Sequence, residues 1–314
     1  MEASVAALLL PSCFFALYFV LEAADWGLCL AAPLVSRNRE ENQAILSLLR
    51  PFLDGNELWF FMGFFMLSIS LPDIRGTGMH AWYMTMLALV AGGALLRMAA
   101  VFLTKTFSSM VMMKGLSVFA LVALFLTGLL GTAVLIDDGS VFTMSGIFCA
   151  AWTVLACFQI GSLYGAVKVV NPLGERFRAA FLVSSCLSVL AYIIFAVTLR
   201  ITLGDAWDAG GYFWMSLIAT ALLFAAAFIL TRSRHPEAGL AAAYASAFFA
   251  IAIYFSAYVL VIPKIHFVDL AALKAGMDAV PGAMFLVAAA VWSLSVFVWR
   301  LFRKKVVYQW QDHI

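Results

Sequence analysis

Long apolar runs separated by short polar breaks dominate the 314-residue chain. A helix that crosses a bilayer needs about 20 mostly apolar residues. Nine segments meet that length: 4–35, 53–72, 79–104, 114–136, 143–168, 177–201, 211–231, 238–262 and 281–302. The first is longer than one bilayer requires, so we expect it to tilt or to project from the membrane. The pattern predicts an all-α integral membrane protein with nine transmembrane helices in a single polytopic membrane domain, residues 1–314.

Turn-forming residues mark the predicted breaks between the spans. The clearest are Leu71-Pro72-Asp73, Asp137-Asp138-Gly139, Asn171-Pro172-Leu173-Gly174 and His235-Pro236. No basic region precedes the first apolar run and no small-residue cleavage pattern follows it. We therefore interpret that run as a retained span and not as a signal peptide.

The distribution of Lys and Arg sets the expected orientation. Fourteen follow the odd-numbered spans: Arg37, Arg39, Arg50, Lys105, Lys114, Lys168, Arg176, Arg178, Arg232, Arg234, Arg300, Arg303, Lys304 and Lys305. Only four lie on the opposite side: Arg75, Arg200, Lys264 and Lys274. Cytoplasmic loops carry the excess of basic residues, which predicts an outside N-terminus and a cytoplasmic C-terminus.

Composition agrees with a membrane solvent. Hydrophobic residues make up 65% of the chain and charged residues 11%, with a mean hydropathy of +1.02. Soluble domains carry about 25% charged residues, so this chain lacks the polar groups to cover itself in water. The net charge of +2 argues against a nucleic-acid partner.

Two pairs of acidic residues fall within or beside the predicted spans. Glu22 and Asp25 share one face of the first span, and Asp54 and Glu57 repeat the same spacing at the start of the second. Two ionised carboxylates on one helical face repel each other, which favours one of them holding a proton, as a proton path requires. The alternative for the second pair is helix capping, with Asp54 as the N-cap and Glu57 completing a capping box.

Arg97 is a cation inside the third predicted span. Ionisable residues inside a span are costly and are functional candidates by default. We expect Arg97 to pair with those carboxylates or with an acidic cofactor group on another chain. The alternative is that its side chain snorkels to the cytoplasmic interface near Lys105.

The positions of the four histidines bear on whether the chain could bind a haem. Haem iron usually takes at least one His ligand, yet His80, His235, His266 and His313 all fall in loops, at span edges or in the tail. No nucleotide-binding glycine loop or metal-ligand cluster is evident either. We therefore expect the chain to have no redox centre, no metal site and no catalytic residue of its own.

Several motifs resemble those of the second subunit of cytochrome bd-type quinol oxidases. Glu22–Gly27 is similar to the family's acidic pair D-G-F-D-x-G, and Pro51–Trp59 to P-x-W-D-G-N-x-x-W at the start of the second span. Arg97 is similar to the arginine of R-P-x-x-F in the third span. Glu22 and Leu53 stand where the family has Asp and Trp, which indicates a divergent member.

The resemblance implies two four-helix bundles plus a peripheral helix in a bacterial or archaeal cytoplasmic membrane. It implies a haem-bearing subunit I that holds the b-type and d-type haems and the quinol site, and that reduces O2 to water with cytoplasmic protons. This chain would be the haem-free subunit, with Asp54 and Asp25 on the proton path beside Glu22 and Glu57. Gly55, Asn56, Trp59 and Arg97 would form a structural or interface motif.

The resemblance leaves room for small accessory membrane subunits and for a quinone or lipid bound to this chain. Two other functions also fit a membrane bundle with buried carboxylates. One is a carboxylate-coupled secondary transporter or channel, which would favour broken spans and an internal repeat, and no repeat is visible. The other is a purely structural scaffold subunit.

Overall fold

The computed structural model describes residues 2–49, 56–70, 78–103, 109–136, 142–204 and 212–261. Over these residues the fold is all-α, as the apolar pattern predicts. The helices are α1 (Glu2–Val35), α2 (Arg39–Leu48), α3 (Asn56–Ser70), α4 (Gly78–Leu103), α5 (Ser109–Ile136), α6 (Met144–Lys168), α7 (Asn171–Leu203), α8 (Tyr212–Arg232) and α9 (Pro236–Val261). All but α2 correspond to the first eight predicted spans. The predicted ninth span, 281–302, lies outside the described residues.

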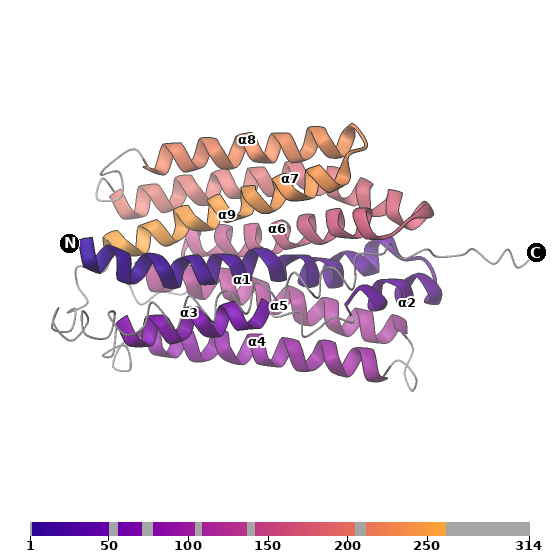
Figure 1. Cartoon of the computed structure of the whole chain (residues 1–314), viewed down its shortest axis with the longest axis horizontal. Helices are drawn as coiled ribbons and strands as arrows, with labels where there is room; N and C mark the ends of the chain where they lie inside the picture. The colour runs from indigo at the N-terminus through magenta and orange to yellow at the C-terminus, as the bar shows by residue number, and fades with distance from the viewer. Residues whose placement is uncertain are drawn as a thin grey trace, which may run out of the picture.

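Helix α1 runs through the middle of the bundle, with α3 and α4 on one side and α6 to α9 on the other (Figure 1). It packs against α3, α5, α6 and α9, while α6 packs closely on α7 and α8 closely on α9. Long helices joined by short turns lie side by side along one axis. Elements far apart in the chain therefore meet on α1, which becomes the axis that positions the polar residues.

Four described helices contain a segment long and apolar enough to cross a membrane: Cys13–Val35, Ser109–Ala133, Met144–Lys168 and Pro172–Leu203. Helices α4 and α8 add shorter apolar segments, Met84–Ala100 and Leu217–Arg232. Large apolar side chains also face outward, as Val183, Leu187 and Leu190 do on α7. Helices that are hydrophobic on all sides are typical of membrane spans.

Two local expectations were wrong. Residues 39–48, which the apolar pattern leaves in a loop, form α2 because Asn38 caps them by accepting a hydrogen bond from Glu41 N. The predicted break at 171–174 is instead the first turn of α7, so this helix begins six residues before the predicted start at 177. Pro172 occupies a first-turn position, where a missing N–H costs nothing and the fixed φ suits a helix.

The closest crossing of α1 with α6 is made by two glycines. A Cβ on Gly161 would lie 2.1 Å from the backbone carbon of Gly27, and one on Gly27 would lie 1.8 Å from Cys157 O. Small residues let membrane helices approach until their backbones touch. This contact fixes α1 against α6 two residues after Asp25.

Gly161→Ala should destabilise the protein, because its methyl group meets backbone that cannot move aside. Overpacking of this kind costs about 1–3 kcal/mol, so the thermal unfolding temperature in detergent should fall by several degrees. Gly115→Ala is the matched control, since apart from the adjoining backbone of its own helix no atom lies within 4 Å of its added Cβ. Equal unfolding temperatures for the two variants would contradict the close crossing.

Candidate functional site: a buried arginine with three carboxylates

Arg97 is buried to 2% exposure and binds three carboxylates. Its Nη2 lies 2.6 Å from Glu22 Oε1 and 2.7 Å from Glu57 Oε1, and its Nη1 lies 2.7 Å from Asp25 Oδ2. The planar guanidinium can serve several carboxylates at once because its N–H donors point in fixed directions. We call Arg97, Glu22, Asp25 and Glu57 the Arg97 cluster.

The helices place these four side chains from separate directions. Glu22 and Asp25 lie one turn apart on α1, Glu57 lies in the first turn of α3, and Arg97 lies in the second half of α4. The cluster therefore joins three helices through charge-assisted hydrogen bonds, which are the stronger kind. Removal of the cation would leave carboxylates of two other helices facing one another.

An indole ring supports the guanidinium. Arg97 Cζ lies 5.2 Å from the centroid of the Trp26 ring, within the range of a cation–π interaction. Gly93 makes room for that ring, because a Cβ there would lie 2.3 Å from Trp26 Cζ2. Phe119 also contacts the indole, with ring centroids 5.7 Å apart.

Exposure differs within the cluster. The side chains of Asp25 and Glu57 are 14% and 13% exposed, whereas that of Glu22 is 3% exposed. Glu22 also lines a cavity of about 110 Å3 that extends between α1, α4, α5, α6 and α9. The cluster thus has two shallower acids and one deep acid that faces an internal cavity.

The structure resolves several sequence hypotheses. Arg97 pairs with carboxylates, as predicted, and the snorkelling alternative is wrong because the side chain is buried. Glu57 Oε1 accepts a hydrogen bond from Arg97 Nη2. Asn56 and Trp59 are buried. Asp54 and Gly55 lie outside the described residues, so their predicted roles stay predictions.

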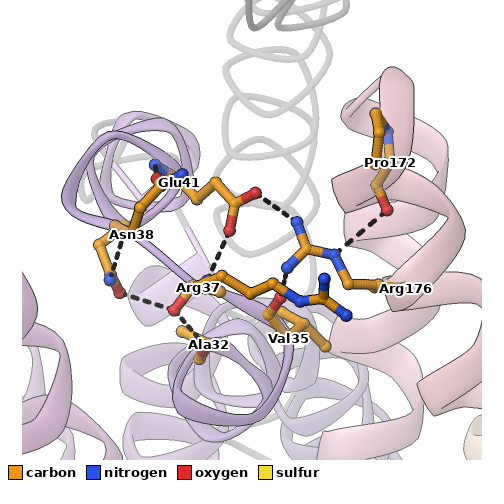
Figure 2. Close-up of polar contacts among 9 residues, drawn as sticks. Ala32, Val35, Arg37, Asn38, Glu41, Pro172 and Arg176 are labelled. Atoms are coloured by element: carbon orange, nitrogen blue, oxygen red, sulfur yellow. Dashed lines mark hydrogen bonds and ion pairs between the residues drawn. The ribbon is translucent and has the colours of Figure 1, made fainter. Parts of the chain in front are cut away.

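A second ionic group, which the sequence analysis did not predict, lies where α1 ends (Figure 2). Glu41 is 1% exposed and accepts hydrogen bonds from Arg37 N at 2.6 Å and from Arg176 Nη2. Arg176 Nη1 also donates to Val35 O at 2.5 Å. Arg176 of α7 therefore holds the C-terminus of α1 and the first turn of α2 together.

The sequence carried a signal for this second group. Asn38 and Glu41 have the spacing of a capping box ahead of an apolar run, and Asn38 Oδ1 accepts from Glu41 N at 2.8 Å. A nearby arginine, Arg178, donates to Thr231 O and Arg232 O and so caps the end of α8. The ends of α1 and α8 and the start of α7 thus share one basic end of the bundle.

The described residues offer no group of three His, Cys, Asp or Glu side chains arranged to hold a metal ion. His235 lies in the turn between α8 and α9, and His266 and His313 lie outside the described residues. His80 lies in the first turn of α4.

The fold and the cluster define a multi-pass helical membrane protein with an ion-paired interior. A family model described as cytochrome bd terminal oxidase subunit II matches residues 3–302. The structure of bd oxidase from Geobacillus thermodenitrificans contains a similar chain, with a TM-score of 0.67 and 15% identity over 95% of this chain and 99% of that one. At that identity the likeness shows the fold. No curated protein sequence matches the chain.

Because the family model spans nearly the whole sequence, the chain belongs to the cytochrome bd terminal oxidase subunit II family. Oxidases of this family act as multi-subunit complexes with quinol:O2 oxidoreductase activity. The sequence resemblance to this family is confirmed.

Arg97→Gln should destabilise the protein strongly, since it leaves three carboxyl groups buried without their cation. Breaking a buried ion pair from one side costs about 3–5 kcal/mol. The carboxyl groups of the folded variant must then take up protons that the unfolded chain does not hold, so its stability should fall as pH rises. Thermal unfolding measured from about pH 5 to about pH 8 tests this pH dependence of stability.

Arg97→Lys is the matched control for charge, and it should lie between the wild type and Arg97→Gln because an ammonium lacks the fork geometry. A deficit for Arg97→Gln that stayed constant across the pH range would contradict the assignment of the carboxylates to this cation.

Proposed function

We propose that this chain is the haem-free subunit of a cytochrome bd-type quinol oxidase and that the Arg97 cluster forms part of its cytoplasmic proton path. The observation that carries the proposal is the binding of one buried arginine to three carboxyl groups. These acids stand where the family's acidic motifs fall in this sequence.

Charge balance supports proton binding at the cluster. One guanidinium neutralises one carboxylate. The cluster, which contains one arginine and three acids, is therefore neutral only when two of the three carboxyl groups hold protons. A net charge in a low-dielectric interior is costly. The neutral cluster therefore holds two protons among its three carboxyl groups, and a proton that binds one acid can leave from another with the net charge restored. Arg97 remains charged throughout because its guanidinium does not deprotonate in proteins.

The arrangement of the acids supports a direction of entry. Asp25 lies one turn nearer than Glu22 to the end of α1 where the described arginines gather: Arg37, Arg39, Arg176, Arg178, Arg232 and Arg234. Basic ends face the cytoplasm, which supports an outside N-terminus. Protons would then reach the more exposed Asp25 and Glu57 first and Glu22 second. Asp54, two residues before α3, would precede them on the route.

The redox chemistry belongs to a partner in this proposal. A haem-bearing subunit I would hold the b-type and d-type haems, oxidise the quinol and reduce O2 to water. The residues of this chain would bind and pass protons, orient the carboxyls through Arg97 and exclude bulk water by the packing of Trp26. Small accessory membrane subunits are compatible with the outward-facing apolar surface.

Purification of the tagged chain from its native membrane should yield a complex whose optical spectrum shows haem carried by another subunit. A stable, haem-free preparation that transports a solute would contradict the proposed function and favour the transporter alternative. The spectrum of the complex also decides between haem d and a partner that holds only haem b.

Asp25→Asn should slow O2 reduction by at least about tenfold while haem content stays unchanged, because an amide cannot pass a proton. Oxygen consumption by the purified complex and proton uptake in liposomes measure the effect. Glu57→Gln and Asp54→Asn should act in the same direction. Glu175→Gln is the matched control, since Glu175 is 63% exposed and pairs with Arg178 away from the cluster.

Wild-type turnover with an unshifted pH profile in all three cluster and motif variants would make the carboxyls structural. Loss of haem in Asp25→Asn together with loss of activity would instead show that the cluster braces the partner subunit.

A further inference from the structure

A second cavity lies on the other side of α6 from the Arg97 cluster, inside the group formed by α6, α7, α8 and α9. Its volume is about 350 Å3, which is in the size range of sites for small molecules. It shares Trp152, Ala156, Ile160 and Ala247 with the first cavity. Because Trp152 lines both spaces, its indole forms part of the wall between them. The ring stacks on Phe195, with centroids 5.8 Å apart.

The walls of this cavity contain no charged side chain. Most of the lining is apolar, and the polar members are uncharged: Gln159, Ser188, Tyr192, Thr220 and Ser246. All five are at least nine-tenths buried. A site of this composition rejects an ion, because no group in its lining offsets the cost of removing a charge from water.

Two hydroxyls in this lining have unused hydrogen-bonding capacity. Tyr192 Oη and Thr220 Oγ1 are buried without a well-formed hydrogen bond among the described residues, and the two lie next to each other. Even a bond between them would use only one of their two O–H donors. A helical threonine hydroxyl usually bonds to a carbonyl one turn earlier, as that of Thr198 does by donating to Ile194 O at 2.8 Å. Buried polar groups normally have partners, and each exception needs an explanation.

The cavity lies at mid-depth and opens sideways. Gln159 and Thr220 lie near the middle of α6 and α8, about half a bilayer core, or roughly 15 Å, from the headgroup level. Helices α7 and α8 touch only sparsely. Ile193 of α7 and Ile218 of α8 line the cavity and are also exposed. The opening therefore faces the lipid and not the water.

From these observations we infer that the space between α6, α7, α8 and α9 binds a neutral, membrane-soluble molecule whose hydroxyl or carbonyl group meets Tyr192 and Thr220. Its apolar body fills the Ala- and Ile-lined part of the cavity, and it enters from the bilayer between α7 and α8. A phospholipid headgroup is excluded by charge and by depth. The inference is independent of the proton path, because none of these residues belongs to the Arg97 cluster.

The probe for this site is a photoreactive long-chain alcohol added to the purified complex in nanodiscs, with the labelled residues mapped by peptide mass spectrometry. Labelling should concentrate on α6 to α9. Dodecanol and a long-chain ketone should compete, whereas dodecane and dodecanoate should compete far less. Tyr192→Phe and Thr220→Val should each reduce labelling about fivefold, the loss expected for one hydrogen bond.

Thr198→Val is the matched control and should label as the wild type does, because its hydroxyl bonds within its own helix. Equal labelling in all variants, or equal competition by dodecane, would overturn the inference and leave only non-specific partitioning. Absence of labelling in this region would overturn it too and would favour water as the partner of the two hydroxyls.

Solvent extraction of the untreated complex identifies the natural occupant. An acyl-chain alcohol or ester and a prenyl-chain carbonyl compound share the recognised group, and mass spectrometry separates them. The co-purified molecule should decrease in Tyr192→Phe and persist in Thr198→Val. Oxygen consumption measured in parallel keeps this test separate from the proton path, since the inference predicts ligand loss whatever the activity.

Discussion

A guanidinium inside a membrane bundle must be matched by acids, and this requirement organises the interior of the protein. Arg97 draws Glu22 and Asp25 of α1 and Glu57 of α3 toward α4. None of these groups is stable in hydrocarbon alone, because isolated buried charges cost far more than any single packing contact returns. The four groups therefore specify how three helices face one another.

Close packing around α1 holds that arrangement. Gly27 and Gly161 bring α1 and α6 into backbone contact, and Gly93 admits the Trp26 ring beside the guanidinium. At the basic end of the bundle, Arg176 joins α1, α2 and α7 through Glu41 and Val35 O. The charged groups are thus fixed from both sides.

The two cavities beside α6 differ in the chemistry that they favour. The lining of the smaller cavity includes a titratable acid, Glu22. The polar groups that line the larger cavity are all neutral hydroxyl and amide groups. One helix with an apolar wall of Trp152, Ala156 and Ile160 separates them. Of the two cavity linings, the one on the α1 side of α6 therefore carries charge, and the one on the α7–α8 side is neutral.

The sequence alone determined the helical membrane class, the position of eight helices and the residues that carry charge inside them. These follow from apolar run length and from the cost of buried charge, which are local properties. The sequence could not decide between pairing and snorkelling for Arg97, because that depends on which helices lie beside α4. Tertiary structure also decided the Glu41–Arg176 contact between residues 135 positions apart, and the burial of the Tyr192 and Thr220 hydroxyls beside one cavity. Such contacts depend on how distant segments pack together, and a single sequence does not show which of its segments lie close in space.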